Sequence, residues 1–205
     1  MVRKLAEAGT RRKREIENER TQNMNMISLP NREAFAVQAA EGWLMLGNAL
    51  EANEELEAVA PEFRYHPTVL AMRWQVYAAA DWWEAAWVVS RALCEVVPDS
   101  PEVWICHANT LRKYKGLVDA RQVLNEITAR FPHDAVIRYN LACYSAQLGQ
   151  LEEACAWLVK AFKIKNTTPL KLAAVYDPDL KPLWDRIGAG NVPELEQHLQ
   201  SSHIK

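Results

Sequence analysis

The sequence is poor in glycine, with 7 in 205 residues, and has no apolar run long enough to cross a membrane. Glycine inside a helix costs about 1 kcal/mol relative to alanine, so an alanine-rich chain with little glycine favours helices. A membrane-spanning helix needs roughly 18 uncharged apolar residues in a row. The basic first residues have no apolar core behind them. We therefore expect neither a membrane anchor nor a secretory signal.

An excess of one charge is also missing. The chain has 24 Lys and Arg against 26 Asp and Glu, for a formal net charge of −2. A protein that binds nucleic acid or an anionic membrane normally presents a surplus of basic residues. We therefore expect no nucleic acid and no membrane surface as the main partner.

The patterns of catalytic and metal sites are absent too. There is no glycine loop for phosphates and no His-x3-His or Cys/His cluster with zinc-ligand spacing. Cys106 and His107 are neighbours, and neighbouring helical side chains point about 100° apart, so they are no nucleophile–base pair. The sequence predicts no enzyme, no cofactor and no metal. No Cys-x-x-Cys pair occurs, so we expect buried free thiols in a reducing compartment, the cytoplasm. The cysteines are Cys94, Cys106, Cys143 and Cys155.

The strongest positive signal is a period of 34 residues, the mark of a repeat architecture. One alanine recurs in it four times, at Ala52, Ala86, Ala120 and Ala154. Each period contains two apolar stripes with the i, i+3, i+4, i+7 spacing of an amphipathic helix. We expect the alanine to be buried between the two helices, because a small side chain lets their backbones approach closely.

These units resemble the tetratricopeptide repeat family, whose pattern runs W-x2-L-G-x2-Y, then A-x3-F, then P. The second unit departs from it, with Arg73 and Trp74 where Leu-Gly is usual. The third and fourth units match at Trp104, Ala108, Leu111, Ala120, Leu124 and Pro132, and at Leu141, Ala142, Gly149, Ala154, Leu158 and Ala161. The resemblance implies an all-α fold, a right-handed superhelical array (an α-solenoid) of antiparallel helix pairs. The four repeats are predicted at 33–66, 67–100, 101–134 and 135–168.

The two ends fall outside the repeat pattern. Residues 1–30 are expected to be a basic arm or helix that either contacts an acidic partner or is a tail that does not fold alone, and we favour the tail. Residues 169–205 are predicted to be a degenerate half-repeat with capping helices, because an array must cover the apolar face of its last unit. Asp179 is expected to cap a helix at residues 180–187, and a last helix is expected at about 193–199.

The resemblance also implies a function, because first helices in this family line a concave groove that binds another protein. Positive charge and donors at Asn109, Arg112 and Lys113 suit an extended peptide or helix with some acidic character. A grip on a C-terminal carboxylate fits Asn109 and Asn140, but Ile105 stands where a lysine is expected. The predicted groove positions are Thr68, Ala71, Gln75, Glu102, Ile105, Asn109, Arg112, Lys113, Val136, Tyr139, Asn140, Cys143 and Gln147.

The predicted function is that of a cytoplasmic protein-interaction module, a scaffold or adaptor. Two alternatives stay open at this point: a secretion-type or client-binding chaperone, and a regulatory subunit of an enzyme. A solvated face that holds no fixed ligand is a further alternative for the groove itself. Trp82 and Trp87 lie off the repeat columns, so they either form an exposed aromatic patch or pack against the next unit. The sequence leaves the partner and the oligomeric state undefined.

Overall fold

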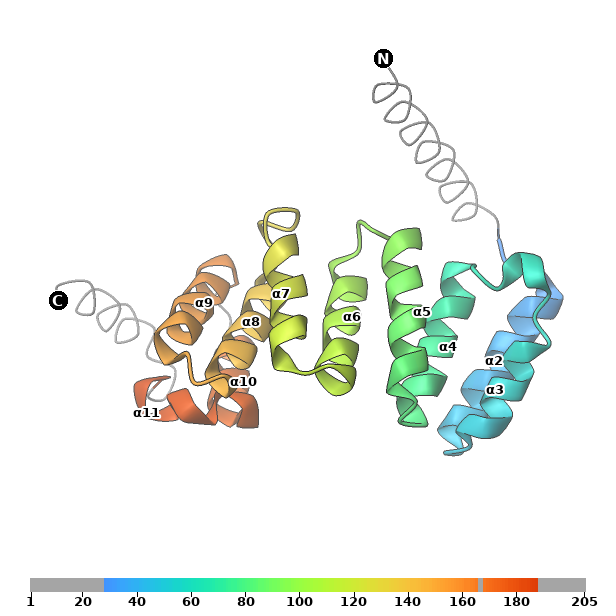
Figure 1. Cartoon of the computed structure of the whole chain (residues 1–205), viewed down its shortest axis with the longest axis horizontal. Helices are drawn as coiled ribbons and strands as arrows, with labels where there is room; N and C mark the ends of the chain where they lie inside the picture. The colour runs from blue at the N-terminus through green and yellow to red at the C-terminus, as the bar shows by residue number, and fades with distance from the viewer. Residues whose placement is uncertain (1–27, 166–167, 188–205) are drawn as a thin grey trace, which may run out of the picture. The chain divides into compact units, whose positions relative to one another are not determined.

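The computed structural model describes residues 28–165 and 168–187, and all regular elements in these ranges are helices (Figure 1). None of these helices is long and apolar enough to cross a bilayer. The elements are α2 (Asn31–Met45), α3 (Ala49–Glu57), η1 (Pro61–Phe63), α4 (Pro67–Ala79), α5 (Trp83–Val96), α6 (Pro101–Tyr114), α7 (Leu117–Ile127), α8 (Ala135–Gln147), α9 (Leu151–Ile164), α10 (Thr168–Tyr176), η2 (Pro178–Leu183) and α11 (Trp184–Ile187).

The helices pack in sequential pairs, α2 with α3, α4 with α5, α6 with α7 and α8 with α9. The second helices of the pairs begin at Ala49, Trp83, Leu117 and Leu151, which are 34 residues apart each time. The all-α class and the paired packing predicted from the sequence are therefore confirmed. The chain divides into two compact units, unit 1 ending at Ser100 and unit 2 beginning at Pro101.

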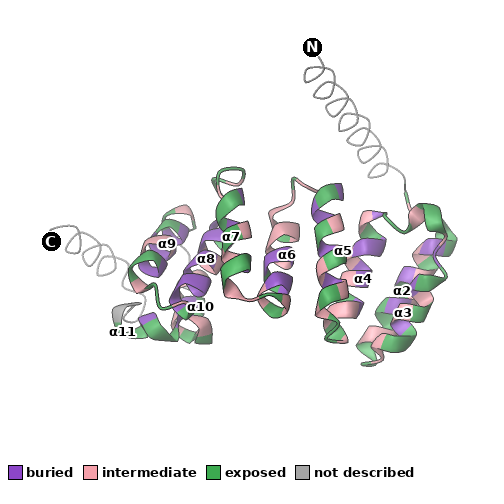
Figure 2. Cartoon of the chain, viewed as in Figure 1, coloured by how far each residue is buried: buried purple, intermediate pink, exposed green. Residues whose placement is uncertain are grey.

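The recurring alanine lies inside every pair. Ala52, Ala86, Ala120 and Ala154 are fully buried, as the sequence predicts. Buried residues gather on the sides of the helices that face their partners, and exposed residues cover the opposite sides (Figure 2). A methyl group at this position lets the two helix backbones approach, and the larger apolar residues around it fill the space between them.

The turns inside the pairs use left-handed backbone conformations. Gly47 and Gly149 have φ angles of 76° and 75°, which glycine adopts without strain. Asp81 stands 34 residues after Gly47 and takes the same conformation, with φ at 57°. Aspartate is one of the few other residues that tolerate this region, at some cost. The turn is thus kept in the second pair although its glycine is missing.

Arg73, the departure from the repeat pattern, is buried in unit 1 and joins α4 to the end of α3. Its guanidinium donates to the Glu57 carboxylate at 2.6 Å and to the Leu56 carbonyl at 2.7 Å. It also donates to the Tyr77 hydroxyl at 3.2 Å. Burial works to lower the pKa of Arg73, but the bonds to Glu57 and Tyr77 outweigh it and the pKa is raised. The same hydrogen bond lowers the pKa of Glu57.

The structure corrects one expectation about burial, that all four thiols are buried. Cys94, Cys143 and Cys155 are buried free thiols, but Cys106 is only half-buried. Trp82 is 39 % exposed and lies against Tyr77, with ring centroids 5.7 Å apart. Trp87 is half-buried under the Arg91 guanidinium, 5.1 Å from the ring centroid.

The predicted helix at residues 180–187 is wrong in its type and its cap. Residues 178–183 form the 3-10 helix η2, and the α-helical part begins only at Trp184. Asp177, rather than Asp179, caps η2, because its carboxylate accepts from the backbone N–H of Asp179 at 2.9 Å. Pro182 lacks the N–H that an α-helix would use, and the Asp179 side chain bonds elsewhere. The predicted arm, except for its last residues, and the predicted helix at 193–199 lie outside the described residues.

Candidate functional site

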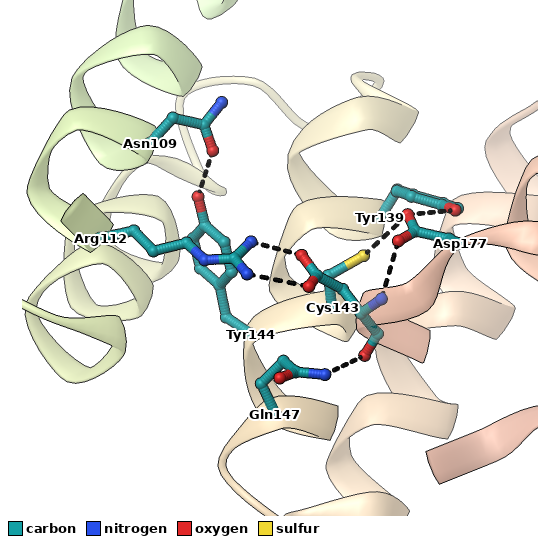
Figure 3. Close-up of polar contacts among 8 residues, drawn as sticks. Asn109, Arg112, Tyr139, Cys143, Tyr144, Gln147 and Asp177 are labelled. Atoms are coloured by element: carbon teal, nitrogen blue, oxygen red, sulfur yellow. Dashed lines mark hydrogen bonds and ion pairs between the residues drawn. The ribbon is translucent and has the colours of Figure 1, made fainter. Parts of the chain in front are cut away.

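Predicted groove positions of unit 2 contact the chain's own C-terminal part. The contacting side chains are Arg112 from α6 and Tyr139, Cys143 and Gln147 from α8 (Figure 3). We call these four residues the α6–α8 face. The three α8 residues are spaced by four, so they lie on one side of the helix. Residues 177–183, which we call the acidic segment, lie along this side, with η2 packed on α8.

Arg112 and Asp179 form a two-pronged ion pair, the strongest polar contact of the site. Nη2 of Arg112 donates to Oδ1 of Asp179 at 2.8 Å, and Nη1 donates to Oδ2. This bond raises the pKa of Arg112. Two parallel bonds between a guanidinium and a carboxylate add directional specificity to the charge attraction. The side chains are 32 % and 27 % exposed, so water weakens the pair and can reach it.

Asp177 uses both carboxylate oxygens. Oδ2 accepts from the Tyr139 hydroxyl at 2.9 Å and from the Cys143 thiol at 3.6 Å, and Oδ1 accepts from the segment's own backbone. Burial, and then the bond to Asp177, raises the pKa of Tyr139. Burial and the nearby carboxylates raise the pKa of Cys143. Both groups therefore stay neutral and act as hydrogen-bond donors to this carboxylate.

Apolar contacts anchor the segment more firmly than its charges do. Leu180 and Leu183 are fully buried, and Gln147 donates to the Asp179 carbonyl at 2.9 Å. Full burial of a leucine is worth roughly 1.5–3 kcal/mol, against about 1 kcal/mol or less for a partly exposed ion pair. The leucines supply most of the stabilisation, and the polar contacts fix the position of the segment.

The two asparagines expected to grip a ligand are engaged within unit 2. Asn109 accepts from the Tyr144 hydroxyl at 2.6 Å, and burial raises the pKa of Tyr144. The Arg112 guanidinium lies over the Tyr144 ring, 5.7 Å from its centroid. Asn140 donates to the Val136 carbonyl of its own helix at 2.9 Å.

The other predicted groove positions differ in exposure. In unit 2, Glu102, Asn109, Lys113 and Val136 are exposed and Ile105 is half-buried. In unit 1, Thr68 and Gln75 are exposed on α4, and Ala71 is half-buried. Each unit therefore presents predicted groove residues to solvent.

Asp177 and Asp179 are the site residues that sequence reasoning missed. From the sequence, Asp179 is expected to cap a helix and Asp177 has no predicted role, while the basic residues of α6 are assigned to an acidic ligand. The basic residue Arg112 and the acidic residue Asp179 are both visible in the sequence, but 67 residues separate them, so no local pattern links the two. Within residues 28–165 and 168–187, no group of three His, Cys, Asp or Glu side chains has the arrangement of a metal site.

Comparison with solved structures places this architecture among known proteins. MamA from Desulfovibrio magneticus RS-1, from residue 41 to its end, superposes with a TM-score of 0.56 at 20 % identity, over 87 % of this chain and 100 % of that one. The ArsTM double mutant of MamA RS-1 gives 0.57 at 20 % identity, over 87 % and 99 %. MamA MSR-1 C2 gives 0.55 at 15 % identity, over 75 % and 90 %.

Other comparisons gave no match. No family model matches the sequence, and no curated protein matches it. At identities of 15–20 %, the likeness to MamA concerns the fold. Over most of its length, the chain has the fold of MamA, a tetratricopeptide repeat protein built from sequential helix pairs.

Proposed function

We propose that this protein is an interaction module, a scaffold or adaptor, that binds a peptide or helix of a partner on the faces of its first helices. A tetratricopeptide fold implies protein partners in general. One observation carries the finer statement: the α6–α8 face already holds a short acidic segment, mostly in a 3-10 helix, that the chain itself supplies. Charge, hydrogen bonds and apolar anchors hold it, which are the means by which helical grooves grip peptides.

The chemistry of the site supports binding rather than catalysis. A catalytic cysteine needs a lowered pKa, because the thiolate is the nucleophile. Burial and nearby carboxylates raise the pKa of Cys143, and burial raises that of Cys106. The Tyr139 hydroxyl is likewise held neutral beside Asp177. These groups serve as donors and packing surface.

A second candidate, the client-binding chaperone, is favoured by one feature of unit 1. Met45, Leu46 and Leu50 around the α2–α3 turn are 81 %, 76 % and 64 % exposed. Exposed apolar side chains that cluster in this way provide a surface for non-native polypeptides. An adaptor uses the first-helix faces instead, so the two candidates predict different contact positions. We place either function in the cytoplasm, as the free thiols suggest.

Site-specific photo-cross-linking tests the proposal. A photoreactive residue replaces Thr68 on α4 or Val136 on α8, with Gln122, exposed on α7, as the matched control and Leu46 as the probe for clients. The adaptor predicts one folded partner cross-linked from Thr68 or Val136 and not from Gln122. Heterogeneous clients captured from Leu46 alone support the chaperone. Equal cross-linking from Gln122 and the first-helix positions contradicts the proposed binding face.

A further inference from the structure

The acidic segment occupies the place where a partner peptide is expected. We infer that the α6–α8 face selects segments of the pattern Asp-x-Asp-Leu-x-x-Leu, and that residues 177–183 occupy it in cis, so that a partner must compete with them. This inference rests on the proposed function, because it names the class of partner for the same face. That class is an acidic peptide with two apolar anchors.

The pattern Asp-x-Asp-Leu-x-x-Leu follows from the contacts that the α6–α8 face and the core of unit 2 make with each residue of the segment. The first aspartate is bound by two neutral donors, the Tyr139 hydroxyl and the Cys143 thiol. The second is bound by the charged fork of Arg112. An asparagine in place of the second aspartate cannot reproduce its contact, because the charged Arg112 would lose its counter-ion. Leu180 and Leu183 follow at positions that place both side chains in the core of unit 2.

The Arg112–Asp179 ion pair is open enough for a partner's carboxylate to replace that of Asp179. Water reaches both partners of the Arg112–Asp179 pair, so an incoming carboxylate can reach the guanidinium from solvent. Asn109, Lys113 and Val136 are exposed on the same two helices. A partner longer than the acidic segment can add contacts there that residues 177–183 do not make.

The covalent link gives the chain's own segment an advantage over a free peptide. A tethered ligand acts at an effective concentration that is typically millimolar for short linkers. A peptide with the same sequence should therefore bind the unaltered chain weakly. Weakening the cis contacts should strengthen the binding of the free peptide, whereas removing exposed charges that do not contact the α6–α8 face should leave that binding unchanged.

Fluorescence anisotropy with a labelled peptide of residues 175–185 tests this on the full chain. We expect Asp177→Asn with Asp179→Asn to bind it at least about tenfold more tightly than the unaltered chain. The control is Asp119→Asn with Asp185→Asn, which removes two exposed charges from the same unit and should bind like the unaltered chain. Adding Arg112→Gln to the first variant should abolish the gain. A peptide with both aspartates replaced by asparagine should not bind.

Alkylation of Cys143 gives a second readout of the same exchange. The thiol is buried beneath the segment, so iodoacetamide should modify it slowly in the unaltered chain and faster in the double variant. The free peptide should restore protection. Peptide mass spectrometry separates Cys143 from Cys155, which is fully buried in α9 and should not change. If the double variant does not fold by circular dichroism, Asp179→Asn alone keeps the Asp177 cap and replaces it.

Equal peptide binding by the unaltered chain and a folded variant overturns the inference, and so does the absence of binding to both. The outcomes also separate this inference from the proposed function. A partner cross-linked at Val136 with no peptide binding leaves the interaction module standing and removes the acidic peptide as its ligand. Peptide binding that depends on Arg112, with no partner captured at either first-helix position, contradicts the proposed function instead.

Discussion

The two units use an arginine on a first helix in opposite ways. In unit 1, Arg73 is buried and bonds to Glu57 and to the backbone of Leu56, in the pair that precedes it. In unit 2, Arg112 is about one third exposed and bonds to Asp179, from the C-terminal part of the chain. An arginine tied to a buried carbonyl serves the structure, because nothing from solvent can replace that acceptor. An arginine whose acceptor is a solvent-reachable carboxylate is positioned for exchange.

The predicted groove residues on the first helices α4 and α8 also differ, in whether they face solvent or contact another part of the chain. On α4, the predicted groove residues Thr68 and Gln75 are exposed. On α8, Tyr139 and Cys143 bond to Asp177 instead. Unit 2 is thus stabilised by the acidic segment as well as by its helix pairs, while Thr68 and Gln75 on the first helix of unit 1 stay open to solvent.

Overpacking the recurring alanine should have the largest effect on this comparison. Ala86→Trp should lower the free energy of unfolding of unit 1, and Ala120→Trp that of unit 2, each by at least about 3 kcal/mol. Neither fully buried site has room for a larger side chain. Hydrogen exchange measured by mass spectrometry reports each unit separately. Gln122→Trp, on the exposed side of α7, is the control and should change little. Loss of protection throughout the chain in both variants would show that the units unfold as one.

Removing an anchor of the acidic segment should affect unit 2 alone. Leu180→Ala should destabilise it by about 2–4 kcal/mol, since the side chain is fully buried. Exchange of the α8 amides should accelerate while that of the α4 amides stays the same. Leu172→Ala on α10, where the leucine is 51 % exposed, is the matched control. An unchanged α8 would mean that the segment adds nothing to the stability of unit 2.

Acid should distinguish the units through Glu57. Its folded-state pKa is lowered, so the stability from the Arg73 bond is fully present above the unfolded pKa of about 4.3 and is lost as the pH falls through the folded value. Glu57→Gln should therefore flatten the loss of unit 1 stability as the pH falls below about 4.3. The effect is modest because the Glu57 side chain is half-exposed. Glu54→Gln, exposed on the same helix, should leave the acid profile unchanged.

The smallest effect is expected at the turn of the second pair. Asp81→Gly relieves the cost of a left-handed aspartate, which is about 1 kcal/mol, but increases the entropy of the unfolded chain. The net gain in unit 1 should be a few tenths of a kcal/mol, seen as a small rise in the urea midpoint. Gly149→Asp, the reverse change in unit 2, should lower that midpoint. A loss of stability for Asp81→Gly would mean that the aspartate side chain contributes more than its strain costs.

The sequence was sufficient for the fold wherever local pattern and packing agree. The 34-residue alanine column identified the helix pairs, because only a small residue fits where two helices cross. Arg73 was recognised as a departure from the pattern, but its partners Glu57 and Leu56 depend on how α3 meets α4. The acidic segment was missed because an aspartate before a helix usually caps it. Only the folded chain shows that Asp179 meets Arg112, since no local rule links residues so far apart.

Trp184 directly follows the acidic segment, as the first residue of α11, and its side chain is 37 % exposed. Indole emission shifts to longer wavelengths as water reaches the ring, so this position carries a natural optical reporter next to the segment. The other seven tryptophans contribute a background, which a Trp184→Phe variant would allow to be subtracted. Release of residues 177–183 could then be followed by light alone, in the unlabelled protein and in real time.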